Sequence, residues 1–316
     1  MNSVAKSAGW SQVGAAIGPS HSKSVSMIKR GFGRAAIVAC GILALPAASL
    51  CAPVKLWETT GLKTPESALP VPAEGFAYVS NIAGKPTDKD GNGFISKVSL
   101  KDGKIVELKW VTGLDAPKGL ALANGHLYVS DIDKLVEIDP KGGKIVARYD
   151  ALGAKFLNDV AADAQGYVFV SDSSASTIWR LNDGKLEKWL ETPDLKFPNG
   201  LHVSGDKVIV AAWGPPGTSA SSSAPANLLE VSPDKTIRQI GDKPLGNLDG
   251  LEPYDADSFL VTDWVAGALY KVDKTGKADL LLNLNQGSAD IGYVPEERMV
   301  LIPMMMDNKL VAYRLD

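Results

Sequence analysis

The sequence predicts an all-β protein, a six-bladed β-propeller in which an N-terminal strand closes the last blade. Three observations support this: one strand pattern recurs six times, each recurrence is followed by a second strand-like run and a turn, and no stretch between them has helical periodicity. Six four-stranded units of about 40–50 residues match the radial sheets of a propeller. A β-sandwich also has many short strands, but it would not explain the register of six repeats.

The repeated segments are alternating apolar residues that lead into a Val-Ser-Asp-like triplet. They read GFAYVSNI, GHLYVSDI, GYVFVSDS, DKVIVAAW, DSFLVTDW and RMVLIPMM. The triplet centres are 50, 41, 40, 51 and 41 residues apart, at Ser80, Ser130, Ser171, Ala211, Thr262 and Pro303. The last unit stops after its third strand, at 308–316, whereas 54–62 resembles a fourth strand. Pairing these two segments would close the ring and protect its sheet edges.

Two of the five spacings exceed the others by about ten residues. The extra residues are AGKPTDKDGNG at 83–93 and GPPGTSASSSAPA at 214–226, both between the second and third strands of their units. The two units lie opposite each other in a ring of six, so both loops should overhang one face of the channel as a candidate lid. The segment 88–99 imitates an EF-hand loop, but Ser99 stands where a bidentate Glu is needed, which favours a turn or lid tip over a second calcium site.

Residues 1–51 are interpreted as a leader and residues 53–316 as a single propeller domain. Within the leader, 27–51 has a basic start, an apolar run and small residues before a cleavage point, which is typical of a secretory signal peptide. Translation is expected to start at Met27. An uncleaved anchor and lipidation at Cys51 are alternatives, but the apolar run is shorter than the ~20 residues of a membrane span. We expect a periplasmic or secreted protein whose mature domain is not inserted in a membrane.

Composition excludes several functional classes. The chain has 316 residues, and those after the leader carry 28 basic and 36 acidic side chains, so nucleic acids and anionic membranes are not expected partners. Both cysteines, Cys40 and Cys51, lie in or beside the leader, which excludes disulfides, thiolate metal sites and cysteine nucleophiles from the domain. A small-molecule substrate is the expected partner, and the oligomeric state is left open.

One polar residue opens the innermost strand of each repeat, 12 to 14 positions before the triplet centre. These residues are Glu66, Lys118, Asn158, Asn199, Asp249 and Asp290. In a propeller they would converge on the axis. Oxygen-rich convergence suits a hard divalent cation, with Glu66 and Asp249 neutralising the ion and Asn158 and Asn199 donating uncharged oxygens. The alternative is that these groups solvate a wet channel or satisfy turn backbone.

Two other sets of residues recur. Asn81, Asp131, Asp172 and Asp263 close the second strand of their units, and this repetition favours structural hydrogen bonding over catalysis. Trp213 and Trp264 follow equivalent positions near the channel mouth. They are expected either to wall an apolar substrate pocket or to pack between blades.

The segments PESAL, LND, PNGL and LDGL at these spacings resemble the senescence marker protein/gluconolactonase family, six-bladed propellers related to the paraoxonases, over the whole mature chain. The resemblance implies that Glu66, Asn199 and Asp249 hold a metal ion, and that Asn158 contacts water or substrate beside it. Calcium is the expected ion, with magnesium, manganese and zinc as alternatives.

The chain departs from the family pattern in two respects. Phe156 stands where gluconolactonase-type members carry an Arg that grips a sugar acid, and Val160 replaces a usual Gly, so the resemblance does not extend to sugar-lactone specificity. His126 and His202 lie outside the motifs of the paraoxonase histidine pair, and His21 lies outside the domain. The two histidines of the domain are expected to be ordinary surface or strand residues.

The function expected from these residues is metal-dependent hydrolysis of an ester-like bond, most simply of a lactone. Asp249 would orient or deprotonate the attacking water, and Asn158 would hold that water or the substrate oxygen. The main alternative is a non-catalytic binding or scaffold propeller that keeps calcium for stability. A third alternative is carbon–carbon bond chemistry of the strictosidine synthase type.

Overall fold

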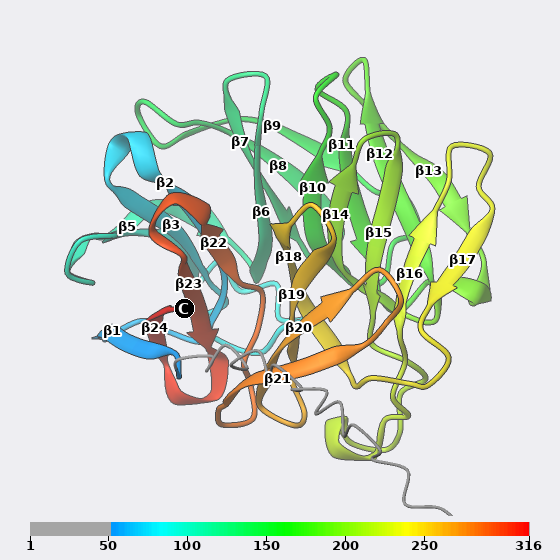
Figure 1. Ribbon diagram of the computed structural model, residues 1–316. Coiled ribbons are helices and arrows are strands. Elements are labelled where there is room, and N and C mark those ends of the chain that lie inside the picture. Colours follow the sequence, from blue (N-terminus) through cyan, green and yellow to red (C-terminus); the bar gives the residue numbers. More distant parts are fainter. Residues whose placement is uncertain (1–51, 316) are drawn as a thin grey trace, which may run out of the picture. The chain divides into compact units, whose positions relative to one another are not determined.

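Six four-stranded antiparallel sheets form the fold, in the order that the repeats predict. The computed structural model describes residues 52–315. The N-terminal strand β1 (Val54–Thr60) pairs antiparallel with β24 (Lys309–Arg314), and in Figure 1 these blue and red strands lie side by side. The six-bladed β-propeller, with its last blade closed by an N-terminal strand, is therefore confirmed. The predicted signal peptide at 27–51 lies outside the described residues.

Each of the first five blades is a meander of four consecutive strands. Blade one contains β2 (Pro65–Val71), β3 (Phe76–Asn81), β4 (Gly93–Ser99) and β5 (Ile105–Leu114). Blade two contains β6 (Pro117–Ala123), β7 (His126–Asp131), β8 (Lys134–Asp139) and β9 (Lys144–Asp150). Blade three contains β10 (Leu157–Ala162), β11 (Val168–Asp172), β12 (Thr177–Asn182) and β13 (Lys185–Glu191).

The remaining blades follow the same plan. Blade four contains β14 (Pro198–Ser204), β15 (Lys207–Ala212), β16 (Leu228–Val231) and β17 (Ile237–Ile240). Blade five contains β18 (Leu248–Asp255), β19 (Ser258–Asp263), β20 (Ala268–Asp273) and β21 (Ala278–Asn283). Blade six contains β22 (Gly292–Val294), β23 (Met299–Met304), β24 and β1.

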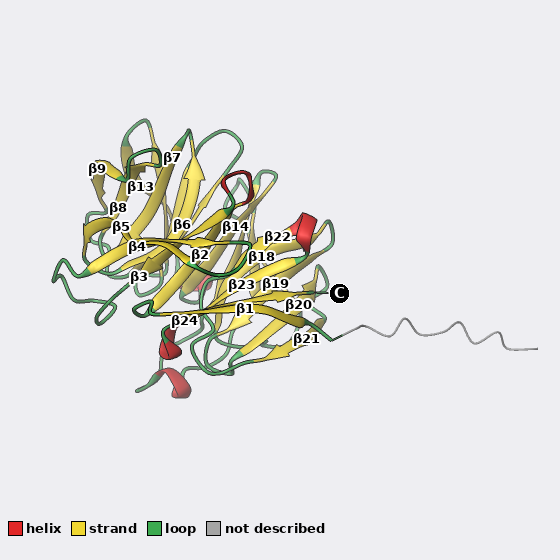
Figure 2. Ribbon diagram, turned by 90° about the vertical axis from the view of Figure 1, so that its left-hand side faces the viewer, coloured by secondary structure: helices red, strands yellow, loops and turns green. Residues whose placement is uncertain are grey.

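Helical structure among the described residues is confined to short 3₁₀ turns, which Figure 2 shows in red at the loops. They are η1 (Pro72–Glu74), η2 (Pro193–Leu195), η3 (Ala220–Ser222), η4 (Pro295–Glu297) and η5 (Met305–Asp307). Within residues 52–315, no helix is long and apolar enough to cross a membrane.

The hydrophobic core is divided among the interfaces between blades. Each of the six large apolar clusters joins two neighbouring sheets; for example, Val79 of blade one packs in one cluster with Leu301 of blade six. The inner strands are almost fully buried, whereas the outermost strand β9 alternates between exposed and half-buried residues. Because apolar burial is the main favourable term in folding, closure of the ring stabilises every blade.

Glycines allow the inner strands to approach one another at the axis. A Cβ atom at Gly200 would lie 2.1 Å from the carbonyl oxygen of Asp249, and one at Gly250 would lie 2.5 Å from the amide nitrogen of Ile291. These neighbours are backbone atoms of the adjacent blade, so a side chain could be accommodated only by moving a strand.

We expect Gly200→Ala to destabilise the protein by about 1–3 kcal/mol, because the added methyl group would push β14 away from β18. Gly142→Ala is the matched control, since a Cβ there meets no atom closer than 4.0 Å. Urea denaturation of both variants measures the effect. A Gly200→Ala variant as stable as Gly142→Ala would show that the inner strands are not in close contact.

Candidate functional site

A β-bulge at the start of each of the first five inner strands sets the position of the predicted site residues. The pairing register shifts between Pro65 and Ala68 in blade one and between Leu248 and Leu251 in blade five, and equivalent shifts occur in blades two, three and four. Each shift contains one of the predicted residues, namely Glu66, Lys118, Asn158, Asn199 and Asp249. Bulges re-aim side chains and are common beside active sites.

Hydroxyl groups of the repeated triplet hold the bulges of blades one, three and five. Thr262 Oγ1 accepts a hydrogen bond from the amide of Gly250 at 2.7 Å and donates to the carbonyl of Ala289, in the next blade, at 2.9 Å. Ser171 accepts from the amide of Asp159 at 2.9 Å, and Ser80 accepts from the amide of Ser67 at 2.9 Å. The triplet serine therefore satisfies an amide that the bulge removes from the sheet ladder.

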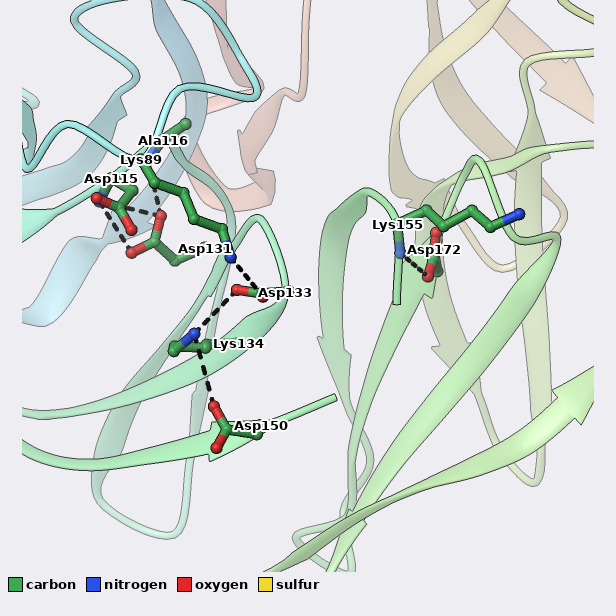
Figure 3. Close-up of polar contacts among 9 residues, drawn as sticks. All are labelled: Lys89, Asp115, Ala116, Asp131, Asp133, Lys134, Asp150, Lys155 and Asp172. Carbon is green, nitrogen blue, oxygen red and sulfur yellow. Dashed lines mark hydrogen bonds and ion pairs between the residues drawn. The ribbon is translucent and has the colours of Figure 1, made fainter. Parts of the chain in front are cut away.

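The acidic residue of the triplet closes the loop that leads into the inner strand. The Asp131 carboxylate accepts hydrogen bonds from the amides of Asp115 and Ala116, the latter at 2.7 Å. The Asp172 carboxylate accepts from the amide of Lys155 at 2.9 Å, and Figure 3 shows both arrangements. The structural role predicted for these residues is confirmed, and through it they help to position Lys118 and Asn158.

All six blades contribute to a single cavity of about 470 Å³ above the bulges. Its floor is formed by Glu66, Lys118, Asn158, Asn199 and Asp249. Its walls are apolar apart from Ser173 and Ser174, and they consist of Ile82, Pro86, Phe156, Phe197, Trp213, Pro216, Ala220, Trp264 and Met305. The volume is in the range of small-molecule sites, and a few converging polar groups in an apolar pocket are typical of them.

The pocket confirms the expectation for the two long loops, and for the two tryptophans it shows both of the predicted alternatives, a place in the pocket wall and contact between blades. Pro86 belongs to the long loop of blade one, and Pro216 and Ala220 belong to that of blade four, so both loops overhang the same mouth. Trp213 and Trp264 lie together in its wall, with ring centroids 5.8 Å apart.

The four predicted ligands reach the same cavity and are each only 4–6% exposed. Five buried side-chain nitrogen or oxygen atoms in residues 52–315 have no hydrogen-bond partner, and three of them are oxygens of this set: Glu66 Oε2, Asn158 Oδ1 and Asp249 Oδ1. Buried polar atoms without partners are uncommon and costly. Three such oxygens at one site are the donor set that a cation would satisfy.

The orientation of Asn158 is fixed by its neighbours. The Ser173 hydroxyl donates its one hydrogen to the carbonyl of Pro198 at 2.7 Å, so its oxygen must accept from Asn158 Nδ2, 3.2 Å away. The amide oxygen of Asn158 is thereby left for the axis. Ser173 is thus a positioning residue, and no sequence pattern indicated it.

Buried carboxyl groups repel one another around the axis. Burial raises the pKa of Glu66 well above its usual value, and the nearby Asp249 and Asp290 raise it further. Burial and Asp290 likewise raise the pKa of Asp249, whereas a hydrogen bond from Asn199 opposes the shift. A divalent cation would reverse these shifts, because it stabilises the charged carboxylates.

Lys118 is the one cation on the floor of the cavity. It is 1% exposed, its Nζ donates to the carbonyl of Ala116 at 3.0 Å, and it lies 4.5 Å from the centre of the Phe156 ring. Burial lowers the pKa of Lys118 to about 8, while Glu66 and Asp131 raise it. Its charge offsets part of the carboxylate repulsion, a role that the sequence did not reveal.

The prediction that Asp290 belongs to the same ring as Glu66 is wrong by one residue. In blade five, Leu248 pairs with Asp263, and Asp249 follows Leu248. In blade six, Ser288 makes the equivalent pair with Met304, so the residue that follows it, Ala289, is the equivalent of Asp249. Asp290 lies one layer below, where its carboxylate accepts a hydrogen bond from Ser67 Oγ at 2.5 Å. A shift of one residue reverses the face to which a strand residue points.

The remaining candidates behave as ordinary residues. His126 pairs with Glu137 at 2.7 Å, His202 packs near Phe259, and neither lines the cavity. In the EF-hand-like segment, Asp90 accepts a hydrogen bond from the amide of Asn92 at 3.0 Å, and no helix flanks it among the described residues.

The metal prediction fits the donor chemistry of this cavity. Residues 52–315 contain no group of three or more His, Cys, Asp or Glu side chains arranged to hold a metal ion. The predicted set instead combines two carboxylates with the amide oxygens of Asn158 and Asn199. Oxygen-only sites of this kind suit calcium or magnesium better than zinc, which favours nitrogen and sulfur.

Comparisons with known proteins support the fold. No protein-family model and no curated protein matches this chain by sequence. A gluconolactonase from Xanthomonas campestris superposes with a TM-score of 0.61 and 15% identity, over 82% of this chain and 89% of that one. Regucalcin from Agrobacterium tumefaciens, a calcium-binding protein, superposes with a TM-score of 0.61 and 15% identity, over 84% of this chain and 94% of that one. A streptogramin B lyase superposes with a TM-score of 0.58 and 12% identity, over 84% of this chain and 97% of that one.

The chain is thus a six-bladed β-propeller. Its solved neighbours include a gluconolactonase, a regucalcin and a lyase, and at these identities the likeness concerns the fold alone.

The stability of the metal-free protein is expected to fall as pH rises from about 4 to 8. Burial raises the pKa of Asp290 to about 7, and burial together with Asp290 raises that of Glu252 to about 8. The folded state therefore binds these protons more tightly than the unfolded chain, so the stabilisation is complete below about pH 4 and is lost through the folded pKa values.

Thermal melts in chelator should give a melting temperature at pH 8 at least about 5 °C below that at pH 5. Asp290→Asn should flatten this dependence, because the amide cannot ionise. A melting temperature that rises over this range would contradict the electrostatic description of the axis.

Proposed function

We propose that this protein is a metal-dependent hydrolase of ester-like bonds, most simply a lactonase. The proposal rests on one observation above all: three unpartnered, buried oxygens, from Glu66, Asn158 and Asp249, converge on the floor of a substrate-sized cavity. Structural similarity to a gluconolactonase and to a calcium-binding regucalcin supports it at the level of the fold.

Two roles are proposed for these residues, binding the metal ion and handling the attacking water, and Asp249 takes part in both. Glu66, Asn199 and Asp249 would hold a divalent ion, calcium first by donor type, with magnesium, manganese and zinc as alternatives. When bound, such an ion polarises an ester carbonyl and stabilises negative charge on its oxygen. The Asp249 carboxylate orients the attacking water and accepts its proton. Asn158, held by Ser173, presents its amide oxygen to that water or to the substrate.

We further propose that the protein acts in the periplasm or outside the cell on a small molecule, because residues 27–51 have the pattern of a secretory signal. N-terminal sequencing of the mature protein tests this. A mature chain that keeps residues 27–51 would contradict export with cleavage.

Lys118 favours one rival function, a non-catalytic propeller. Its buried ammonium group already offsets charge on Glu66, and this lowers the demand of the site for a metal ion. In this alternative a bound ion only stabilises the ring. A metal ion could raise the melting temperature under either function. Only the turnover of a substrate therefore distinguishes the hydrolase from the non-catalytic propeller.

The hydrolase should cleave lactones in the presence of calcium and lose this activity in chelator. Asp249→Asn and Asn199→Ala should each lower kcat/KM by about 10²–10⁴, because they remove the proton acceptor and an oxygen ligand. A colorimetric proton-release assay with a lactone panel measures this.

Asn285→Ala is the matched control, because its side chain bonds Asp307 at an exposed loop. Unchanged activity of Asn199→Ala would count against the proposal. Stabilisation by calcium without turnover of any lactone or phosphotriester would establish the scaffold alternative.

A further inference from the structure

The apolar walls of the cavity carry an inference about its substrate. We infer that the site selects a compound with a large apolar body, and that Phe197, Trp213 and Trp264 are the residues that select it. The apolar body follows from the walls alone, whereas the identity of the reacting bond rests on the proposed function. Together they describe a lactone or ester with an alkyl or aryl substituent.

The distribution of polar groups in the cavity disfavours a polyhydroxylated substrate. The charged and amide groups lie on the floor, where the reacting carbonyl would be bound. In the wall, Ser173 already accepts from Asn158 and donates to Pro198, so of the wall residues only Ser174 adds a hydroxyl group. Hydroxyl groups buried against the remaining walls would lose hydrogen bonds to water without replacement.

The Phe197 ring is placed by an unusual backbone conformation. Phe197 has φ of 62°, and Lys196 before it has φ of 54°, both in the left-handed region that bulky residues rarely adopt. The carbonyls of these two residues accept hydrogen bonds from the amides of Trp213 and Gly214, each at 2.9 Å. Strained conformations of this kind cluster at functional sites, and here the strained segment carries an aromatic ring of the cavity wall two residues before Asn199.

Trp213 and Trp264 form a second aromatic wall. Their ring planes are inclined by 55° and both side chains are half-buried, so each retains surface for contact with a ligand. The Trp213 backbone is held by Asn247, whose Nδ2 donates to its carbonyl at 2.8 Å. The same Asn247 amide donates to Ala224 at 3.1 Å and so fixes the base of the long loop that carries Pro216.

Phe156 shields the one cation on the floor of the cavity. Its ring covers the Lys118 ammonium group, 4.5 Å from the ring centre, and so presents an aromatic face beside the only cation among the residues that line the cavity. An ammonium group shielded in this way is a weak partner for a strongly hydrated sugar acid. The walls therefore favour an apolar body above a polar, reacting end.

The experiment uses the calcium-loaded mature protein with γ-lactones that carry alkyl chains of increasing length, a phenyl-substituted γ-lactone, and gluconolactone. We expect kcat/KM to rise about fourfold with each buried methylene group, which corresponds to about 0.8 kcal/mol, until the cavity is filled. Gluconolactone should be the poorest substrate.

Trp264→Ala should reduce this increment to less than twofold, because part of the wall is lost. Trp110→Ala is the matched control, since Trp110 packs against Tyr78 outside the cavity, and it should keep the full increment. An unchanged increment in Trp264→Ala would overturn the inference.

Binding is measured separately by tryptophan fluorescence in Asp249→Asn, with the same lactones as probes. Tighter binding of longer chains with no turnover by the unmodified protein would leave the apolar selectivity standing and overturn the hydrolase proposal. Turnover that favours gluconolactone, or that does not depend on chain length, would overturn the inference and leave the hydrolase proposal standing.

Discussion

The bulge at the start of the inner strands is the feature on which the rest of the structure depends. It removes one residue from the sheet ladder and turns that side chain toward the axis, at the cost of an amide that needs a new partner. A hydroxyl such as Thr262 supplies that partner, and a glycine such as Gly250 allows the next blade to come close. The repeat that builds the ring therefore also builds the floor of the cavity, so fold and candidate site have one origin.

Convergence at an axis concentrates charge that the protein must then compensate. Glu66 and Asp249 are buried together with Asp290 one layer below, and Lys118 is the only cation beside them in the cavity floor. The unpartnered oxygens show that internal hydrogen bonding does not complete the compensation. Buried, unpartnered oxygens beside repelling carboxylates lower the stability of the folded protein, as is common at functional sites. The six apolar cores between the blades offset this loss.

Much of this arrangement could be predicted from the sequence, because the repeat fixes the blade order and alignment identifies Glu66, Asn158, Asn199 and Asp249 as the residues that meet. Asp290 was misplaced because a spacing of 12 to 14 residues tolerates the one-residue slip that reverses a side chain. The orientation of Asn158 depends on Ser173 and Pro198, and the burial of Lys118 beside Phe156 depends on packing between blades. Such contacts join residues with no shared pattern, so periodicity could not indicate them.

The sixth blade is the one sheet of the ring that combines strands from both ends of the propeller domain. Every other sheet is completed by strands that follow one another along the chain, whereas Val54 pairs with Arg314 at the opposite end. Pairing across such a separation carries the largest loop-closure entropy in the molecule, so the sixth blade is expected to assemble last. Until β24 has been synthesised, β1 has no partner in its sheet and the ring stays open, so the two ends of the propeller domain must both be present before the sixth blade is complete.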